Sequence, residues 1–259
     1  MDHQYSHDNH HEGGFKNTIR NSILILIFEM IGSMFLTLLY ICHSYDLGGF
    51  LLGFFVLLIF GAKVSGSHYN PCVTFAFMFR RDTGKFSRTL GIAYILFQLI
   101  GAFIGGLLAF FFNNYQQIQF GIKTSYVGYA IAAEVLGSFF LAFMYLTQTE
   151  EKTKLSKDPA ITTLIIASAY IAALLMVSGP EDYLACLNPA VALGASFQQL
   201  YSGSADGWKV SYVYLPSPFL GGLIAVFFHE FVYKKVMTTI QESEDIDGIL
   251  DKNEEEHDE

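Results

Sequence analysis

An internal repeat places the strongest constraint on how this chain folds. The segment Glu29-Met-Ile-Gly-Ser-Met-Phe-Leu36 returns in the second half as Glu134-Val-Leu-Gly-Ser-Phe-Phe-Leu141. Two later segments recur in the same order: residues 70–73 (Asn-Pro-Cys-Val) as 188–191 (Asn-Pro-Ala-Val), and residues 103–106 (Phe-Ile-Gly-Gly) as 219–222 (Phe-Leu-Gly-Gly). Self-similarity in a constant order indicates the duplication of one unit. In a membrane protein, the interface between two such copies is where the working site is expected.

The composition indicates a membrane protein. Hydrophobic residues make up 52% of the chain and charged residues only 15%, whereas soluble domains carry about 25% charged residues. Apolar segments cover residues 22–42, 48–62, 89–112, 127–147, 160–178 and 211–233. A helix needs about 20 such residues to cross a bilayer, so 48–62 is short unless it continues toward residue 66. We therefore predict an all-α membrane protein with six transmembrane helices. No cleavable signal peptide is expected, because the first apolar segment is long enough to be a full span.

The segments outside the spans complete the predicted domain organisation. We expect a disordered cytoplasmic N-terminus over residues 1–20, one membrane domain over 21–240, and an acidic cytoplasmic tail over 241–259. The membrane domain divides into repeats at about 21–115 and 125–236. The cysteines Cys42, Cys72 and Cys186 match no zinc-site spacing. We therefore expect free thiols and no metal site.

Lysine and arginine placement predicts the orientation. Loops on the cytoplasmic side of a membrane are enriched in these residues. If both termini are cytoplasmic, the outer loops hold only Lys123 and Lys209. The inner segments then hold Lys16, Arg20, Arg80, Arg81, Lys85, Arg88, Lys152, Lys154, Lys157, Lys234, Lys235 and Lys252. This asymmetry favours cytoplasmic termini and an even number of spans.

Each half also contains an apolar stretch that is too short to cross the membrane. Residues 70–79 and 188–200 both begin with Asn-Pro. Asparagine is a strong N-cap and proline suits the first turn of a helix, so both stretches read as half-helices that begin sharply. Because each repeat has three spans, the second copy is inverted relative to the first. The half-helices then enter from opposite faces and meet near the midplane as parts of an inverted repeat.

The meeting point of two helix N-termini has predictable chemistry. Each N-terminus carries roughly +0.5 of an elementary charge, so the pair repels cations. The side-chain amides of Asn70 and Asn188 offer donors to a neutral oxygen. The irregular backbone before them, residues 65–69 and 181–187, is tolerable at membrane depth only where it lines a wet cavity. Its carbonyl groups then form a ladder of acceptors along a pore.

With these features the chain resembles the aquaporins, the major intrinsic protein family. Ser65-Gly-Ser-His-Tyr-Asn-Pro-Cys-Val-Thr74 corresponds to the first family signature and Leu187-Asn-Pro-Ala-Val191 to the second, while Pro218-Phe-Leu-Gly-Gly222 lies in the last span. The resemblance implies a homotetramer of six-helix barrels, each with its own pore. It also implies that the two boxes at the centre of that pore are Asn70, Pro71, Cys72 and Asn188, Pro189, Ala190.

Two positions depart from the family pattern. The first box ends in Cys72 where alanine is usual, and Val191 follows the second box where family members usually carry an arginine that narrows the outer mouth. Spacing from the boxes transfers the remaining filter positions to Phe50, Met176 and Ala185, and an insertion in the loop over residues 178–183 would shift the Met176 position by one or two residues. A ring of these residues with Val191 would be wide and apolar. Solutes larger than water would then fit, but the ring would offer permeating water no hydrogen-bond donor. Cys186 is the better candidate for blockage by thiol reagents. Cys72 reads first as a small residue packed behind the box, and the alternative is a constriction that is sensitive to thiol reagents.

Three polar residues read as supports of the loops. Glu29 and Glu134 occupy equivalent positions in the two repeats. The resemblance implies that each carboxylate accepts backbone N–H bonds from the half-helix loop of its own repeat, and the alternative is a proton relay. His68 corresponds to the family's loop histidine, and reads as a packing and hydrogen-bonding residue or as a pH sensor.

The expected function is passive passage of water and small uncharged solutes such as glycerol, urea, ammonia or hydrogen peroxide, with ions and protons excluded. An ion-coupled secondary transporter is the alternative, because such transporters also use inverted repeats and broken helices. An intramembrane enzyme would need a recognisable catalytic group, and no such constellation occurs in the sequence. No cofactor and no nucleic-acid partner are expected.

Overall fold

The computed structural model describes residues 8–43, 46–81, 86–113, 120–179 and 183–244, with side chains from Ser22 onward except at residues 43 and 124. Within these ranges the protein is all-α, apart from one isolated β-bridge between Ile122 and Tyr183. This is the predicted fold class.

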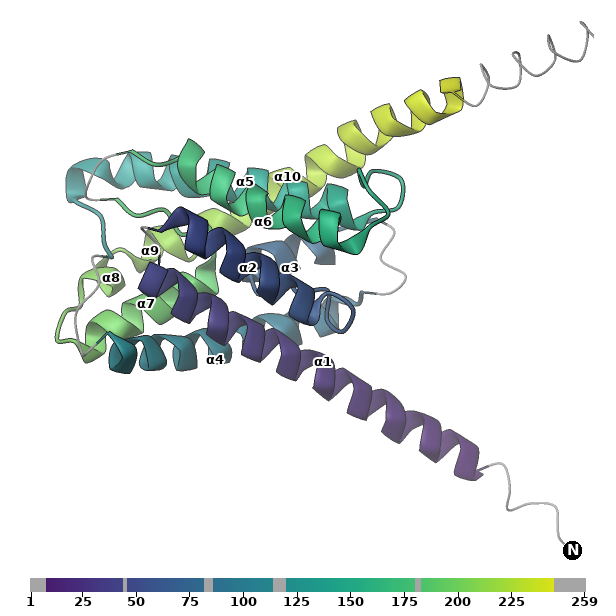
Figure 1. The fold of residues 1–259 in the computed structure, drawn as a ribbon, viewed down its shortest axis with the longest axis horizontal. Helices are drawn as coiled ribbons and strands as arrows, with labels where there is room; N and C mark the ends of the chain where they lie inside the picture. The colour runs from purple at the N-terminus through teal and green to yellow at the C-terminus, as the bar shows by residue number, and fades with distance from the viewer. Residues whose placement is uncertain (1–7, 44–45, 82–85, 114–119, 180–182, 245–259) are drawn as a thin grey trace, which may run out of the picture.

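Four helices make up the first repeat (Figure 1). They are α1 (Asp8–His43), α2 (Leu47–Gly61), the short α3 (Pro71–Met78) and α4 (Arg88–Phe112). The second repeat begins after a short turn, Thr124–Tyr126, and contains α5 (Val127–Thr149), α6 (Pro159–Met176) and the short α7 (Pro189–Tyr201). Its last helix is interrupted near its start. It consists of α8 (Asp206–Lys209), α9 (Ser211–Tyr214) and α10 (Ser217–Phe228), followed by a π-helical turn, His229–Tyr233, and further helix to residue 244.

The protein is an integral, multi-pass membrane protein. Five helical segments are long and apolar enough to cross a bilayer: Ser22–Cys42, Arg88–Phe112, Val127–Thr149, Pro159–Met176 and Ser211–Glu244. The sixth predicted span is α2, which has 15 residues and is therefore only about 22 Å long at 1.5 Å per residue. It ends at Gly61 rather than continuing toward residue 66, because the chain turns there into the loop before α3.

Both ends of the chain differ from the expected boundaries. Disorder was predicted over residues 1–20, but α1 already begins at Asp8. Extending an existing helix adds one hydrogen bond per residue without a new nucleus, so a spanning helix readily propagates into adjacent polar sequence. The final helix runs to residue 244, past the predicted start of the acidic tail at 241. The rest of that tail lies outside the described residues.

The repeated glycine pairs explain how the helices cross so closely. A Cβ atom added at Gly105 of α4 would lie 2.3 Å from the Met34 carbonyl oxygen of α1, and one added at Gly221 of α10 would lie 2.4 Å from that of Val135 in α5. The first glycine of each pair therefore packs the last long helix of a repeat on the first helix of the same repeat.

The second glycine of each pair joins the two repeats. A Cβ at Gly106 would lie 2.3 Å from the Gly194 carbonyl oxygen in α7, and one at Gly222 would lie 3.0 Å from that of Cys72 in α3. Each half-helix thus packs against the last long helix of the opposite repeat. The recurrent Phe-Xaa-Gly-Gly segments are contact points of an inverted duplication.

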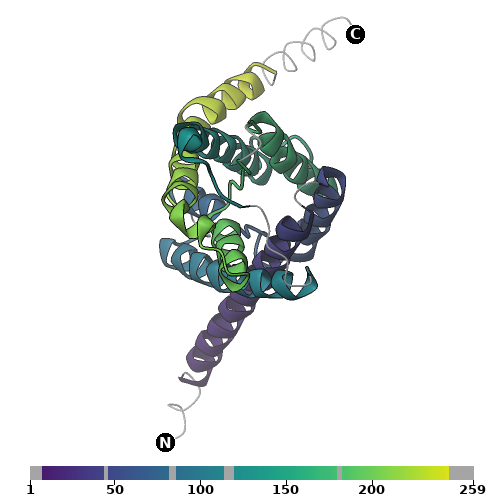
Figure 2. The same cartoon turned by 90° about the vertical axis from the view of Figure 1, so that its left-hand side faces the viewer.

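The long helices form a ring when the molecule is viewed from one end, and the segments that connect to the half-helices run inward from it (Figure 2). The N-terminal end of α1 and the C-terminal helix project from the same end of the bundle (Figure 1). This placement agrees with an even number of membrane crossings.

Candidate functional site

The two half-helices begin at capped asparagines. The Asn70 side-chain oxygen accepts the backbone N–H of Cys72 at 2.9 Å, and that of Asn188 accepts the N–H groups of Ala190 and Val191 at 3.0 and 3.3 Å. Proline occupies the first turn of both helices. These local contacts explain why each short helix starts where it does.

The half-helices meet at these capped ends, deep inside the protein. The Asn70 side-chain amide donates to the Leu187 carbonyl oxygen at 3.0 Å, and the Asn188 amide donates to the Tyr69 carbonyl oxygen at 3.0 Å. Each asparagine therefore reaches across to the residue that precedes the other asparagine. A primary amide has two N–H donors, so one donor of each side chain is left to bind another oxygen. The contact is the end-to-end arrangement that the inverted repeat predicts.

The loops that lead to the asparagines are held in a rare backbone conformation. Tyr69 and Leu187, at equivalent positions, have φ values of +46° and +59°, and Ser67 has +53°. A residue other than glycine in this left-handed region costs roughly 1–3 kcal/mol and persists only when its surroundings enforce it. Strain at matching places in both loops indicates that other groups hold their shape.

Glu29 supplies that support in the first repeat. Its carboxylate accepts the backbone N–H of His68 at 3.0 Å and that of Tyr69 at 2.8 Å, and the Gln98 side chain donates to it at 2.7 Å. The carboxylate is fully buried, and all of its contacts are donors. The Glu29 carboxylate thus joins α1 to the loop before α3.

Glu134 makes the equivalent contacts in the second repeat. Its carboxylate accepts the backbone N–H groups of Cys186 and Leu187, each at 2.8 Å, and the Tyr183 hydroxyl at 2.9 Å. It too is fully buried. Both carboxylates are therefore occupied by neutral donors of the loop they support.

His68 packs inside the wall of the first loop. Its ring is buried and lies 4.3 Å from the Phe77 ring, between centroids, and its Nδ1 atom is 3.2 Å from the Thr74 hydroxyl. Aromatic rings of Phe86, Tyr94 and Tyr145 also surround it.

The predicted filter residues occupy different surroundings. Phe50 is buried against the rings of Tyr40 and Tyr170, with centroids 6.1 and 5.4 Å away. Ala185 is joined to the same group, because its carbonyl oxygen accepts the Tyr40 hydroxyl at 2.7 Å. Val191 is fully buried in the first turn of α7.

Met176 does not belong to this buried group. It is the last residue of α6 and 58% of its surface is exposed. The α6 residue that packs on Phe50 is Tyr170, one and a half turns earlier. Met176 therefore does not share the buried surroundings of Phe50, Ala185 and Val191, and the aromatic ring of Tyr170 lies beside Phe50 instead.

Tyrosine hydroxyls contact both loops in a way that the sequence reading missed. In the second loop, the carbonyl oxygens of residues 184, 185 and 186 accept hydroxyls at 3.0, 2.7 and 2.7 Å, from Tyr214, Tyr40 and Tyr170 respectively. In the first loop, Ser65 accepts from Tyr94 at 2.8 Å, and Tyr145 donates to both Gly66, at 3.3 Å, and Ser67. The sequence did carry a signal for these contacts, because a tyrosine within an apolar span has a hydroxyl that needs a hydrogen-bond partner when it is buried.

Two cavities approach the half-helix contact. The larger, about 450 Å³, is lined by Ser67, His68, Tyr145 and Ile166 together with Lys63, Lys154 and Lys157 at its mouth. The smaller, about 120 Å³, is lined by Tyr40, Tyr183, Leu184 and Ala185. They share no lining residue, and each reaches one of the two loops.

Comparison with known proteins establishes the family. A family model described as Major intrinsic protein matches residues 47–229 of the 259. The chain belongs to the major intrinsic protein family. It is 30% identical over 191 residues to the probable aquaporin PIP2-5 of Arabidopsis thaliana, covering 70% of this chain and 63% of that protein. It is 29% identical over 210 residues to aquaporin PIP1-3 of the same plant, covering 75% and 70%.

The similarity with the first of these relatives thus spans less than two thirds of that protein's length. A solved structure has the same fold: the aquaglyceroporin from Plasmodium falciparum superposes with a TM-score of 0.67 and 20% identity, covering 84% of this chain and 99% of that one. The fold of this major intrinsic protein is therefore that of a six-helix barrel with two half-helices.

The cysteines of this major intrinsic protein are free, and two of them are buried at the site. The Cys72 thiol lies 2.9 Å from the Pro218 carbonyl oxygen in α10, and the Cys186 thiol lies 3.4 Å from the Asn188 carbonyl oxygen. Both residues are fully buried. A thiol reagent can therefore reach either of them only after the surrounding side chains move.

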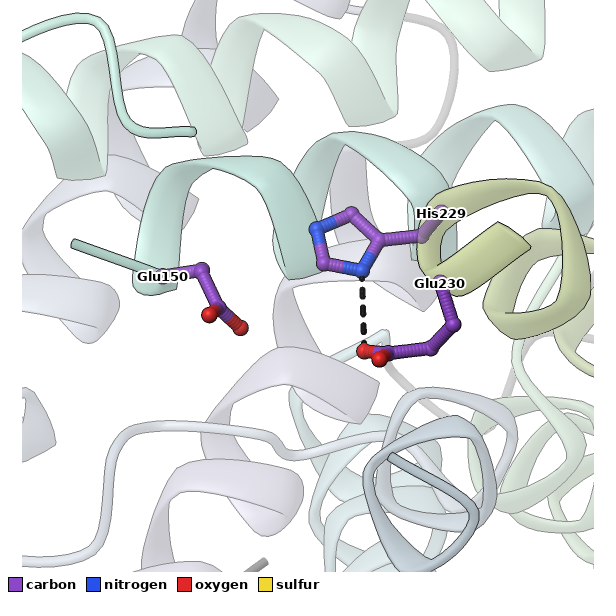
Figure 3. Close-up of side chains that lie close together, drawn as sticks. All are labelled: Glu150, His229 and Glu230. Carbon is purple, nitrogen blue, oxygen red and sulfur yellow. Dashed lines mark hydrogen bonds and ion pairs between the residues drawn. The ribbon is translucent and has the colours of Figure 1, made fainter. Parts of the chain in front are cut away.

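A charged cluster lies just beyond the C-terminal end of α5, and Figure 3 shows three of its side chains, Glu150, His229 and Glu230. Glu150, His229 and Glu230 have potential metal-ligand atoms within 4.8 Å of one another. However, Arg80 pairs with the Glu150 carboxylate, and Lys234 Nζ lies 2.9 Å from it and 3.8 Å from Glu230. Two cationic side chains thus take the place that a metal ion would need.

The charge of Glu150 is stabilised within this cluster. Burial opposes its ionisation, but hydrogen bonds and positive charge from Lys234 and Arg80 outweigh burial and lower its pKa below the ordinary value. The cluster therefore reads as an ion-pair network that joins the end of α3, the loop after α5 and the last helix.

Proposed function

We propose that this major intrinsic protein is a passive channel, rather than an enzyme, for water and other small uncharged solutes. The observation that carries the proposal is the reciprocal pair of bonds from Asn70 to Leu187 and from Asn188 to Tyr69. These bonds hold two amide donors and two helix N-termini at one buried point. A neutral oxygen can accept the remaining amide hydrogens there, while the positive helix ends oppose cations.

An ion-coupled transporter is less well supported. Coupling needs a titratable or cation-binding group near the midplane that is available to the ion. Glu29 and Glu134 are the buried carboxylates at that depth in the described spans, and each accepts two backbone N–H groups and one side-chain donor. Carboxylates that hold the loops in this way would have to release them in order to bind an ion.

Water is the first solute that we assign, with hydrogen peroxide and ammonia next in size and glycerol and urea as candidates. The proposed filter consists of Phe50, Ala185 and Val191 with Tyr170. The aromatic rings around Phe50 are buried and closely spaced, which favours the smallest solutes. Val191 offers no charged donor in place of the usual arginine.

Assembly and orientation complete the proposal. The outer faces of the helices carry many exposed large apolar side chains, including Leu52, Val56, Ile92, Leu96 and Ile100. Such faces suit lipid and the neighbouring subunits of a homotetramer. The excess of lysine and arginine at the end that carries the termini supports cytoplasmic termini.

Osmotic shrinkage of proteoliposomes tests the channel. Purified protein in vesicles should accelerate the stopped-flow light-scattering change under a sucrose gradient relative to protein-free vesicles. Repeating the measurement with inward glycerol, urea and hydrogen peroxide gradients ranks the solutes. Asp206→Asn, at an exposed position in the short helix α8, serves as a matched variant. Rates equal to those of protein-free vesicles for every solute, or uptake that depends on an ion gradient, would contradict the proposal.

A further inference from the structure

The acceptor ladder expected to line the pore is occupied by the protein itself. Carbonyl oxygens of the second loop accept the hydroxyls of Tyr40 and Tyr170 at 2.7 Å, and those of the first loop accept the Tyr145 hydroxyl. These three tyrosines come from α1, α6 and α5. Residues from three separate helices therefore converge on the backbone groups that a permeating molecule would use.

Two of these tyrosines line the cavities. Tyr145 lines the cavity on the side of the termini, and Tyr40 lines the cavity on the other side. Tyr170 packs edge-on against both Phe50 and Phe54, with centroids 5.4 and 5.2 Å away, and all three rings are almost fully buried. The two cavities share no lining residue.

We propose that Tyr40, Tyr170 and Tyr145 are flux-determining residues that close the conduit by substituting their hydroxyls for permeating water at the loop carbonyls. This inference rests on the proposed channel function. The closed form is the one described by the structure. The conduit opens when a ring rotates away and water takes over the carbonyl group that the hydroxyl leaves.

The exchange is energetically balanced, which makes these residues effective regulators of flux. A tyrosine–carbonyl bond and a water–water bond are replaced by a water–carbonyl bond and a tyrosine–water bond, so the number of hydrogen bonds is unchanged. Removing the hydroxyl should therefore shift the closed-to-open ratio by roughly two- to tenfold per residue. The ring contacts with Phe50 remain in a Tyr→Phe variant and limit the effect.

Tyr214 provides a matched control. Its hydroxyl donates to the Leu184 carbonyl oxygen at 3.0 Å, one residue before the carbonyl that Tyr40 binds. Its ring stacks on Phe120 and Tyr183 with centroids 4.6 and 6.4 Å away, whereas the rings of Tyr40 and Tyr170 pack on Phe50. Tyr214→Phe thus removes a similar hydrogen bond without touching the proposed closure.

The experiment measures water permeability per incorporated protein for the parent, Tyr40→Phe, Tyr170→Phe, Tyr145→Phe and Tyr214→Phe in proteoliposomes. We expect a roughly two- to tenfold increase for the first three variants and no change for Tyr214→Phe. Tyr170→Ala, which also removes the ring, should conduct faster than Tyr170→Phe. Parent-level permeability in the three Phe variants and in Tyr170→Ala would overturn the proposal.

A second measurement separates failure of this inference from failure of the channel function. Tyr170 donates to the Cys186 carbonyl, and the Cys186 thiol is fully buried. If Tyr170 closes the conduit, a small methanethiosulfonate should label Cys186 faster in Tyr170→Phe than in the parent, as followed by peptide mass spectrometry. Faster labelling without water permeation in any variant would refute the channel but retain the closure. Equal labelling rates with a conducting parent would refute the closure but retain the channel.

Discussion

The two repeats are nearly identical at the centre of the protein and differ at its two ends. At the centre, Glu29 and Glu134 each hold two backbone N–H groups of a strained loop. At one end, α3 leads into Arg80 and its ion pair with Glu150. At the other end, the neutral amide of Gln199 in α7 donates to the Phe120 carbonyl oxygen at 2.6 Å and accepts the Gly207 N–H at 2.7 Å.

The difference shows which features the duplication had to retain. The meeting of two half-helices requires both copies to keep the same caps and the same buried carboxylate. The ends face opposite sides of a membrane, so the charge-based preference for one side acts on each end separately. The central symmetry is what the proposed conduit requires, and the asymmetry of the ends agrees with the proposed orientation.

The largest expected effect is the loss of a supporting carboxylate. Glu134→Ala leaves two buried backbone N–H groups and the Tyr183 hydroxyl without their acceptor. Each such group costs about 1–3 kcal/mol, so we expect roughly 3 kcal/mol or more of destabilisation. Glu29→Ala should cost a similar amount because it also strands three donors.

Thermal unfolding in detergent measures this pair of variants. Glu134→Gln, which keeps one acceptor oxygen, is the matched control and should lie between the parent and Glu134→Ala. If the alanine variant of one repeat keeps the stability of the parent and the other does not, the two carboxylates share a geometry but do not contribute equally to stability.

The next effect concerns ion exclusion at the half-helix contact. Asn188→Asp keeps an N-cap oxygen but adds a negative charge beside two positive helix ends. We expect proton or cation leak to rise on the order of tenfold, the factor that corresponds to 1.4 kcal/mol. Asn70→Asp should behave alike, because the two asparagines make reciprocal bonds. Dye-reported leak in vesicles measures both, and an unchanged leak would count against the helix-end argument.

A smaller effect is expected at the residue after the second box. Val191→Arg introduces the bulk and the charged donor that family members usually carry there, and should reduce glycerol or urea flux several-fold while affecting water less. Val191→Leu controls for added volume alone. Equal solute flux in the parent and Val191→Arg would mean that selectivity is decided elsewhere, with Tyr170 and Phe50 as the next positions to change.

The smallest expected effect concerns the pH dependence of stability at the charged cluster around Glu150. Since the folded-state pKa of Glu150 lies below its ordinary value of 4.5, its contribution to stability is complete above that pH and is lost as the pH falls through the folded-state pKa. Glu150→Gln should therefore flatten the acid limb of a plot of Tm against pH, by a few degrees at most. The exposed pair of Lys209 and Asp206 at the other end should give no measurable change when Asp206 becomes Asn. A steep acid limb in Glu150→Gln would assign the pH dependence to other groups.

The central geometry could be predicted from the sequence because each part carries a local signal. Asn70-Pro71 and Asn188-Pro189 specify a cap and a first helical turn, and a buried glutamate needs donors wherever it lies. Equivalent positions in an inverted duplication then require the two ends to meet. The start of α1 was predicted less well, because helix propagation into polar sequence depends on the neighbouring span.

The aromatic group around Phe50 could not be predicted in the same way. Met176 was chosen by counting from Asn188, and a count fails wherever the intervening loop changes length. Tyr40 and Tyr170 lie in different spans with no shared motif, so nothing local indicates that their hydroxyls reach adjacent carbonyl groups. That convergence depends on how α1 and α6 pack on α2, which only the folded chain specifies.

The sequence by itself determined the membrane-spanning class, the inverted duplication and the polar boxes at its centre, because periodicity, capping and hydropathy act over a few residues. The tertiary structure alone decided which side chains gather around Phe50 and which carbonyl groups they bind. Those contacts join residues far apart in the chain, and the free energy of a buried hydroxyl depends on the partner that packing brings to it.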